Sequence, residues 1–178
     1  MGLKINSKSK IYTADPIVIK GLFERAAGVT LVEKNGRLCC DARVCIENNE
    51  EITTLPEFMT LRRGLVLKNC TNLTELPKGL ISNCLFIENC PKLETLPIDL
   101  WVKVDVRIVG CDGITSLPDT MVVLRDLSIE NCKGFTTLPE GFKVGVMGDG
   151  GINIIDCPNF KGLPYALAAG EVKIKNCP

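Results

Sequence analysis

Hydrophobic and polar positions along this chain follow a phrase that recurs about every 20 residues. Two adjacent copies, residues 65–77 and 85–97, share the pattern L-x-[LI]-x-N-C-x-x-L-x-x-L-P. We call the position of its cysteine the anchor. The anchors, spaced by 21, 20, 21, 21, 25 and 20 residues, are Asn49, Cys70, Cys90, Cys111, Cys132, Cys157 and Cys177. Repetition at such a period predicts a solenoid, in which each phrase forms one repeat of the structure.

Each repeat carries apolar residues at fixed distances from its anchor. Pairs such as Val44 and Ile46 lie five and three positions before it, and pairs such as Ile52 and Leu55 lie three and six positions after it. The first pair alternates as a strand does, so we expect it to point into the core. The residues six, four and two before the anchor should then face solvent. A proline seven residues after each of the first six anchors favours an extended return segment.

The segment before the repeats predicts a helix and a hairpin. Asp15 followed by Pro16 is a strong helix start, and Gly28 is placed to end that helix. Residues 29–40 alternate around Asn35-Gly36, which favours a tight hairpin turn. We therefore expect a flexible lead-in over 1–14 and an N-terminal cap over 15–42. A repeat domain of about seven repeats, the last truncated, should follow over 43–178.

The repeated L-x-L-x-x-C-x-x-L core resembles the leucine-rich repeat family, over roughly residues 43–178. The resemblance implies an α/β-type solenoid: a right-handed superhelix with a parallel sheet on its concave side and little helix on its convex side. The added L-P and the short period look most like leucine-rich repeat modules of bacterial effector proteins delivered into host cells. Those modules usually have asparagine at the anchor and a helical N-terminal cap, and this chain departs from both. Similar phrases occur in plant disease-resistance receptors, with longer repeats.

Ten cysteines could indicate a secreted disulfide framework, but most of them occupy one repeat position. Stacked in register, their thiols would form a row whose parallel side chains neither bridge easily nor surround a metal ion. We therefore favour buried free thiols in a reducing cytosol over disulfides or a metal site. We expect a cytoplasmic protein, or one secreted without a Sec signal into a host cytosol. The polar, lysine-rich start has no signal-peptide core, and no apolar run is long enough to span a membrane.

Composition narrows the function classes further. The chain has no histidine, which removes the commonest general base and metal ligand. Its formal net charge is zero, so there is no overall attraction to nucleic acid. We expect no catalytic residues, no cofactor and no metal, and a monomer. The glycine-rich insertion at 143–151 lacks the following helix of a phosphate-binding loop, so an outer bulge is the preferred interpretation.

The candidate binding surface lies on the solvent-facing strand positions. Phe86 and Val66 place apolar side chains where polar ones are expected, and Arg107 is adjacent, a composition typical of interface hot spots. Acidic residues around them favour a partner with a basic patch. The alternative is an ordinary solvated strand surface with Phe86 partly covered. The candidate residues are Val66, Phe86, Glu88, Asp105, Arg107, Asp126, Ser128 and Glu130.

Three functional hypotheses remain open. The first is a non-catalytic protein–protein interaction module, of which a bacterial effector acting in host cells is one form, holding a protein or peptide on its concave strands. The second is the substrate-recognition domain of a larger enzyme, such as an effector ubiquitin ligase. The third is a receptor ectodomain, which the missing signal disfavours. Asp105 and Asp126 could suggest acid–base hydrolysis, but an open sheet offers no pocket to separate their pKa values.

Overall fold

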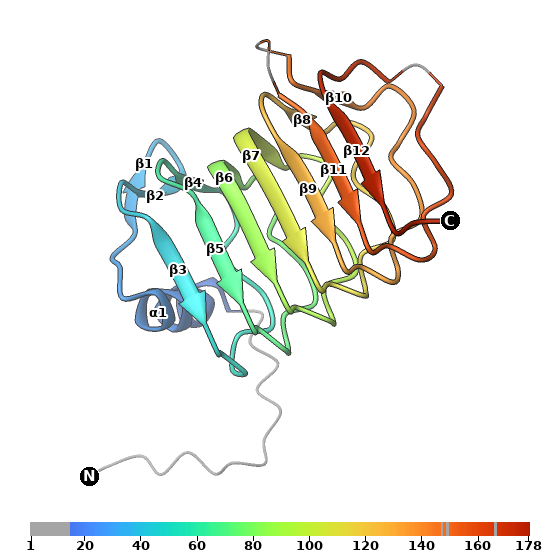
Figure 1. Ribbon diagram of the computed structural model, residues 1–178. Coiled ribbons are helices and arrows are strands. Elements are labelled where there is room, and N and C mark those ends of the chain that lie inside the picture. The colour runs from blue at the N-terminus through green and yellow to red at the C-terminus, as the bar shows by residue number, and fades with distance from the viewer. Residues whose placement is uncertain (1–14, 147, 149, 166) are drawn as a thin grey trace, which may run out of the picture.

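A computed structural model describes residues 15–178 except 147, 149 and 166; the predicted lead-in over 1–14 lies outside the described residues. The chain winds into a solenoid of about six turns with stacked parallel strands and little helix. Figure 1 shows the strands side by side along the length of the molecule. The elements are α1 (Pro16–Ala27), β1 (Val32–Lys34), β2 (Arg37–Cys40), β3 (Val44–Glu47), β4 (Met59–Leu61), β5 (Leu65–Lys68), β6 (Ile81–Glu88), β7 (Trp101–Val109), β8 (Val122–Val123), β9 (Leu127–Glu130), β10 (Lys143–Val144), β11 (Ile152–Ile155) and β12 (Val172–Lys175).

The strand register confirms the repeat alignment at every step. Val44 pairs with Leu65, and Leu65 pairs with Leu85, as their common place five residues before an anchor predicts. The 25-residue step does not disturb this register, because Ile152 pairs with Leu127 on one side and with Val172 on the other. The extra residues of that step are therefore accommodated outside these strands.

The core is a column of aliphatic side chains that runs through the solenoid. From β3 to β11, the residues five and three before each anchor are all essentially inaccessible to solvent, as the spacing predicts. The last repeat differs, since Val172 is 40% exposed and Ile174 is 41% exposed. Their side chains occupy the inward positions of β12 but have no further repeat packed over them in the described structure.

The first five repeats also contribute a second inward pair that the sequence analysis did not identify. These residues lie ten and twelve positions after the anchor, as do Met59 and Leu61, and they are buried, whereas Leu167 and Ala169 of the next repeat are partly buried. They lie in or directly before parallel strand segments, because β4 pairs with β2 and with the start of β6, and β8 pairs with β10. The segment that follows each L-P thus forms a second strand column, which the sequence analysis did not predict.

The predicted helix and hairpin both form. Asp15 caps α1 by accepting a hydrogen bond from the amide of Ile17, and Gly28 ends the helix in the left-handed conformation. Asn35 and Gly36 have positive φ angles and join β1 to β2, which are antiparallel. Phe23 of α1 is fully buried and belongs to the same core cluster as the repeats. That these elements serve as a terminal cap stays a prediction.

A row of left-handed residues marks the end of the strands. The residue just before each anchor has a φ angle between 52° and 62°, and these residues are Asn48, Asn69, Asn89, Gly110, Asn131, Asp156 and Asn176. Asparagine tolerates this conformation better than other non-glycine residues. The side chain of Asn69 also donates to Asn48 at 2.7 Å, so part of the row is a hydrogen-bonded ladder along the solenoid.

The anchor cysteines form the predicted inner row. Cys70, Cys90, Cys111, Cys132 and Cys157 are fully buried, and all ten cysteines are free thiols. Each anchor thiol donates to the carbonyl two residues before it, and several also reach a carbonyl of the preceding repeat. Asn49 acts differently, because its side-chain oxygen accepts from the amides of Glu51 and Ile52, as expected for an inward asparagine.

The glycine-rich insertion is only partly described, since residues 147 and 149 are not. Its first residues form β10, and its last glycines pack tightly between repeats. A Cβ on Gly150 would lie 2.0 Å from the carbonyl oxygen of Arg125, and one on Gly151 would lie 2.7 Å from that of Glu171. These two glycines are thus required by close backbone packing. No helix in the described part of the chain is long and apolar enough to cross a membrane.

Candidate functional site on the strand face

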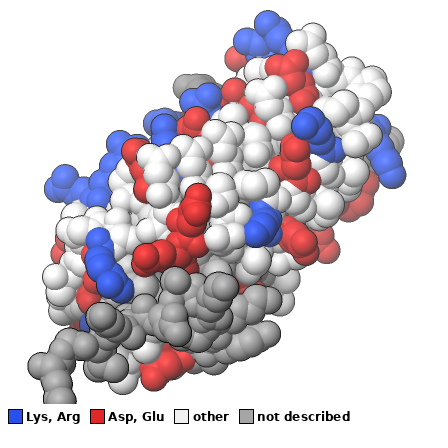
Figure 2. Space-filling model, turned by 90° about the horizontal axis from the view of Figure 1, so that it is seen from below, with Lys and Arg blue, Asp and Glu red and all other residues white. Residues whose placement is uncertain are grey.

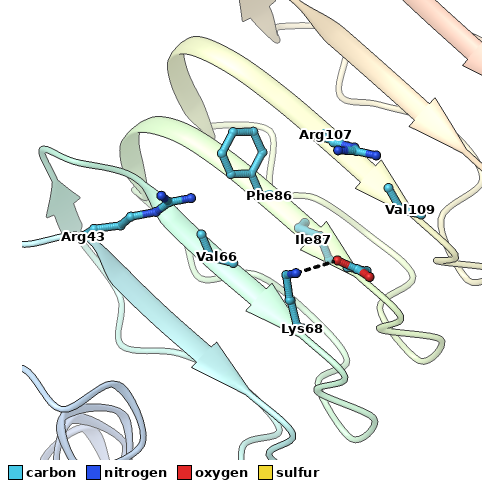
Figure 3. Close-up of a pocket in the computed structure, with 8 residues that line it drawn as sticks. Arg43, Val66, Lys68, Phe86, Ile87, Arg107 and Val109 are labelled. Carbon is cyan, nitrogen blue, oxygen red and sulfur yellow. Dashed lines mark ion pairs between the residues drawn. The ribbon is translucent and has the colours of Figure 1, made fainter.

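The solvent-facing side of β3, β5, β6, β7, β9, β11 and β12, which we call the strand face, carries a hollow of about 310 Å³. Figure 3 shows its side chains, with the Phe86 ring standing away from β6 near the centre. We call this hollow the Phe86 hollow. Its lining residues come from four neighbouring repeats and are Arg43, Val66, Lys68, Phe86, Ile87, Glu88, Arg107 and Val109.

The Phe86 side chain contacts residues of the neighbouring strands. The guanidinium carbon of Arg43 lies 5.9 Å from the centre of the Phe86 ring, within the range of a cation–π interaction. Arg107 is the direct register partner of Phe86 on β7, and Val66 is its partner on β5. The ring therefore lies between two arginine residues, next to an aliphatic neighbour, and is half-buried.

The expectation of exposed apolar surface is wrong for Val66, which is 4% exposed. Strand partners on both sides and the overlying ring and arginine shield its short side chain, whereas Phe86 is long enough to rise above them. The structure brings four predicted residues together in the hollow, namely Val66, Phe86, Glu88 and Arg107. The other four, Asp105, Asp126, Ser128 and Glu130, lie on the strand face beyond it.

The predicted acidic residues form ion pairs with basic side chains of the protein itself. Glu88 pairs with Lys68 at 3.0 Å, and Glu130 pairs with Arg107 at 3.3 Å while accepting from the Ser128 hydroxyl at 2.7 Å. The hydrogen bond to Glu88 is the main cause that raises the pKa of Lys68. Carboxylates that are already paired attract a basic partner less than their number suggests, so the basis for expecting such a partner is weakened.

Asp105 and Asp126 share one guanidinium. Arg125 contacts both oxygens of Asp105, at 2.9 and 3.0 Å, and one oxygen of Asp126 at 3.2 Å. The Coulomb attraction of Asp105 is the main cause that raises the pKa of Arg125. Asp126 also accepts from the amide of Gly151 at 3.0 Å, so it helps to order the end of the insertion. In this arrangement both carboxylates are engaged in holding the strand face together.

A second hollow, of about 500 Å³, lies next to Asp126. Its lining includes Lys103, Leu124, Arg125 and Asp126. Arg125, which lines this hollow, is engaged in ion pairs. The described lining residues include no aromatic side chain. This composition makes it a weaker candidate for binding than the Phe86 hollow.

Two residues that shape the strand face were missed by the sequence prediction. Arg43 occupies a solvent-facing position, but nothing in the pattern signals that its side chain crosses to a ring two strands away. Arg125 lies seven residues before its anchor, outside the positions expected to line the face. A charged residue adjacent in sequence to Asp126 was a signal that could have suggested the pairing.

The buried thiols are poor nucleophiles. A hydrogen bond between the thiols of Cys90 and Cys111 raises the pKa of Cys90 to about 12, and burial raises the pKa of Cys132 to about 11. A thiol reacts through its thiolate, so these groups are largely inert near neutral pH. The burial of the row in the core gives it a packing role.

Charged side chains of both signs are interspersed on the face seen in Figure 2. Figure 2, which views the molecule from below Figure 1, shows basic and acidic side chains interspersed with uncharged surface. The formal net charge of the chain is likewise zero. Local differences, such as those around Phe86, are therefore the electrostatic features that can distinguish one partner from another.

No family model, curated protein or solved structure matches this chain. The repeats of the chain can instead be compared with one another. At the position four before the anchor, the repeats carry Cys45, Val66, Phe86, Arg107, Ser128, Asn153 and Lys173. Phe86 is the one aromatic residue in this described column, which singles out its repeat from its neighbours.

Proposed function

We propose that this protein is a non-catalytic interaction module that binds a protein or peptide segment on its strand face, at the Phe86 hollow. The observation that carries the proposal is a half-exposed aromatic ring flanked by two arginines on a rigid parallel sheet. Aromatic and arginine side chains are the commonest anchors of protein interfaces, and regular strands position them precisely enough for recognition.

The repeat motif supports placing the chain with the leucine-rich repeat proteins, and this assignment is part of the proposal. The seven strands in register, with apolar pairs inside and an asparagine or cysteine anchor, are consistent with it. The short L-P repeat supports a likeness to bacterial effector modules. The helix and hairpin would then be a terminal cap, because they bury Phe23 and Leu31 in the repeat core.

The proposal is tested by selecting random 12-residue peptides displayed on phage against the immobilised protein. Selected peptides should bind in solution and lose at least tenfold in affinity to Phe86→Ala, because an anchor ring contributes about 2 kcal/mol or more. Lys173→Ala changes the same column on β12 and should bind as the wild type does. An unchanged melting temperature for Phe86→Ala shows that the fold is intact.

Two results would contradict the proposal. One is a selection that enriches no peptide that binds in solution. The other is a set of peptides whose affinity is the same for the wild type and for Phe86→Ala.

A further inference from the structure

The charges around the Phe86 hollow are unequal at its two edges. At the edge where the strands end, Glu47, Lys68 and Glu88 are register partners on neighbouring strands, so one cation lies between two carboxylates. At the edge where the strands begin, Arg43 crosses over Phe86, and in the described part of the chain it has no carboxylate within ion-pair distance. The hollow is thus negative at one edge and positive at the other.

A second arginine strengthens the positive edge. Arg63 is exposed and directly precedes Gly64, whose carbonyl accepts the amide of Val44, the residue after Arg43. The two arginines therefore lie on adjacent repeats at the same edge of the sheet. Arg62 also lies there but is engaged by Asp41 at 3.3 Å. Arg63, like Arg43, has no ion pair among the described residues, so their charge is available to a ligand.

We propose that the segment held in the Phe86 hollow is an acidic peptide, with a carboxylate at the Arg43–Arg63 edge and an apolar side chain against Phe86. This inference rests on the proposed function and specifies its partner. Carboxylates bind guanidinium groups through paired, charge-assisted hydrogen bonds, and the aromatic floor supplies the apolar contact. Of the three basic side chains that line the hollow, Lys68 and Arg107 already have carboxylate partners within the protein, which leaves Arg43.

The structure therefore reverses the preference suggested by the sequence. Counted without their ion pairs, the acidic residues Asp105, Asp126 and Glu130 favour a basic partner. Once their pairing with Arg125 and Arg107 is included, the unpaired charge beside the aromatic ring is positive. Electrostatic complementarity then favours an acidic ligand at this site.

The test uses three displayed 12-residue sublibraries of equal diversity that share the same apolar residues. One allows Asp and Glu as its charged residues, one allows Lys and Arg, and one allows none. We expect the acidic sublibrary to supply the enriched peptides. Their affinity, measured by fluorescence anisotropy, should fall at least tenfold with Arg43→Glu and with Phe86→Ala. Raising the salt concentration from 50 to 500 mM should weaken binding.

Two charge-matched controls separate a site from general attraction. Arg25→Glu makes the same change on the exposed side of α1, and Lys173→Glu makes it on the strand face away from the hollow. Neither should alter binding by more than twofold. Enrichment from the basic or neutral sublibrary would overturn the acidic preference while leaving the interaction function intact. Equal losses for Arg43→Glu and Arg25→Glu would also overturn it, and no enrichment from any sublibrary would contradict the proposed function itself.

Discussion

The side-chain amide of Asn89 donates to the side-chain oxygen of Asn69 on the preceding repeat, at 3.0 Å. Asn69 in turn donates to Asn48 at 2.7 Å. All three residues have φ angles between 52° and 54°, in the left-handed region. The recurring asparagine before the anchor therefore has two roles, because it permits the sharp bend that ends the strand and it links adjacent repeats.

Substitution of Asn69 separates these two roles. Asn69→Gly removes both side-chain hydrogen bonds but suits the left-handed backbone, so it should cost about 1 kcal/mol. Asn69→Ala removes the same bonds and, unlike glycine, keeps a Cβ at positive φ without asparagine's tolerance of that conformation, which should cost about 1 kcal/mol more. Urea unfolding of the two variants measures the difference. If alanine proved as stable as glycine at this position, the conformational role would be wrong.

The thiol row makes a prediction about chemical reactivity. With a disulfide-exchange reagent at pH 8, Cys45 should react in the native protein, together with the half-buried Cys39, Cys84 and Cys177. The fully buried anchors should react only on unfolding, because burial shields them, and raised pKa values keep Cys90 and Cys132 protonated. All ten thiols should be counted in denaturant.

Cys45→Ser provides the control for this assignment, since it should lower the native count by one and leave the slow thiols unchanged. A native protein in which every thiol reacts at once would contradict the buried row. A denatured count well below ten, without added reductant, would indicate disulfides instead.

Acid should weaken one contact between repeats. The carboxylate of Asp112 accepts from the amide of Lys133 at 3.0 Å, and this hydrogen bond is the main cause that lowers the pKa of Asp112. Because the folded pKa lies below the unfolded one, the contribution is present above about pH 4 and is lost as the pH falls through the folded pKa. The side chain is 44% exposed, so the effect should be below about 1 kcal/mol.

Urea unfolding at pH 6 and pH 2.5 tests this contact. The wild type should lose more stability between these two values than Asp112→Asn does. Asp119→Asn, at an exposed aspartate of the same repeat, should follow the wild type. Identical losses in all three proteins would show that Asp112 does not contribute.

The sequence predicted the solenoid because its signal is local and repeated. Each phrase places two apolar residues on one side of a short strand, and seven copies agree on the register even across the longer step at Ile152. The second strand column was not predicted although Met59 and Leu61 repeat their spacing, because the predicted repeat pattern ended at the proline and these two residues lie beyond it. The character of the candidate surface was predicted less well. Its character depends on where Arg43 and Arg125 reach, and the reach of long side chains across strands has no periodic signature.

The two isoleucines Ile154 and Ile174 offer a matched test of how the core is built. They are direct register partners on β11 and β12 and hold the same place in their repeats, three before the anchor. Ile154 is fully buried between neighbouring repeats, whereas Ile174 is 41% exposed. Ile154→Ala should therefore cost about 2–5 kcal/mol of unfolding free energy, and Ile174→Ala under about 1 kcal/mol. Equal losses in chemical denaturation would mean that β12 is covered in solution, since a partly exposed side chain cannot lose the packing that Ile154 loses.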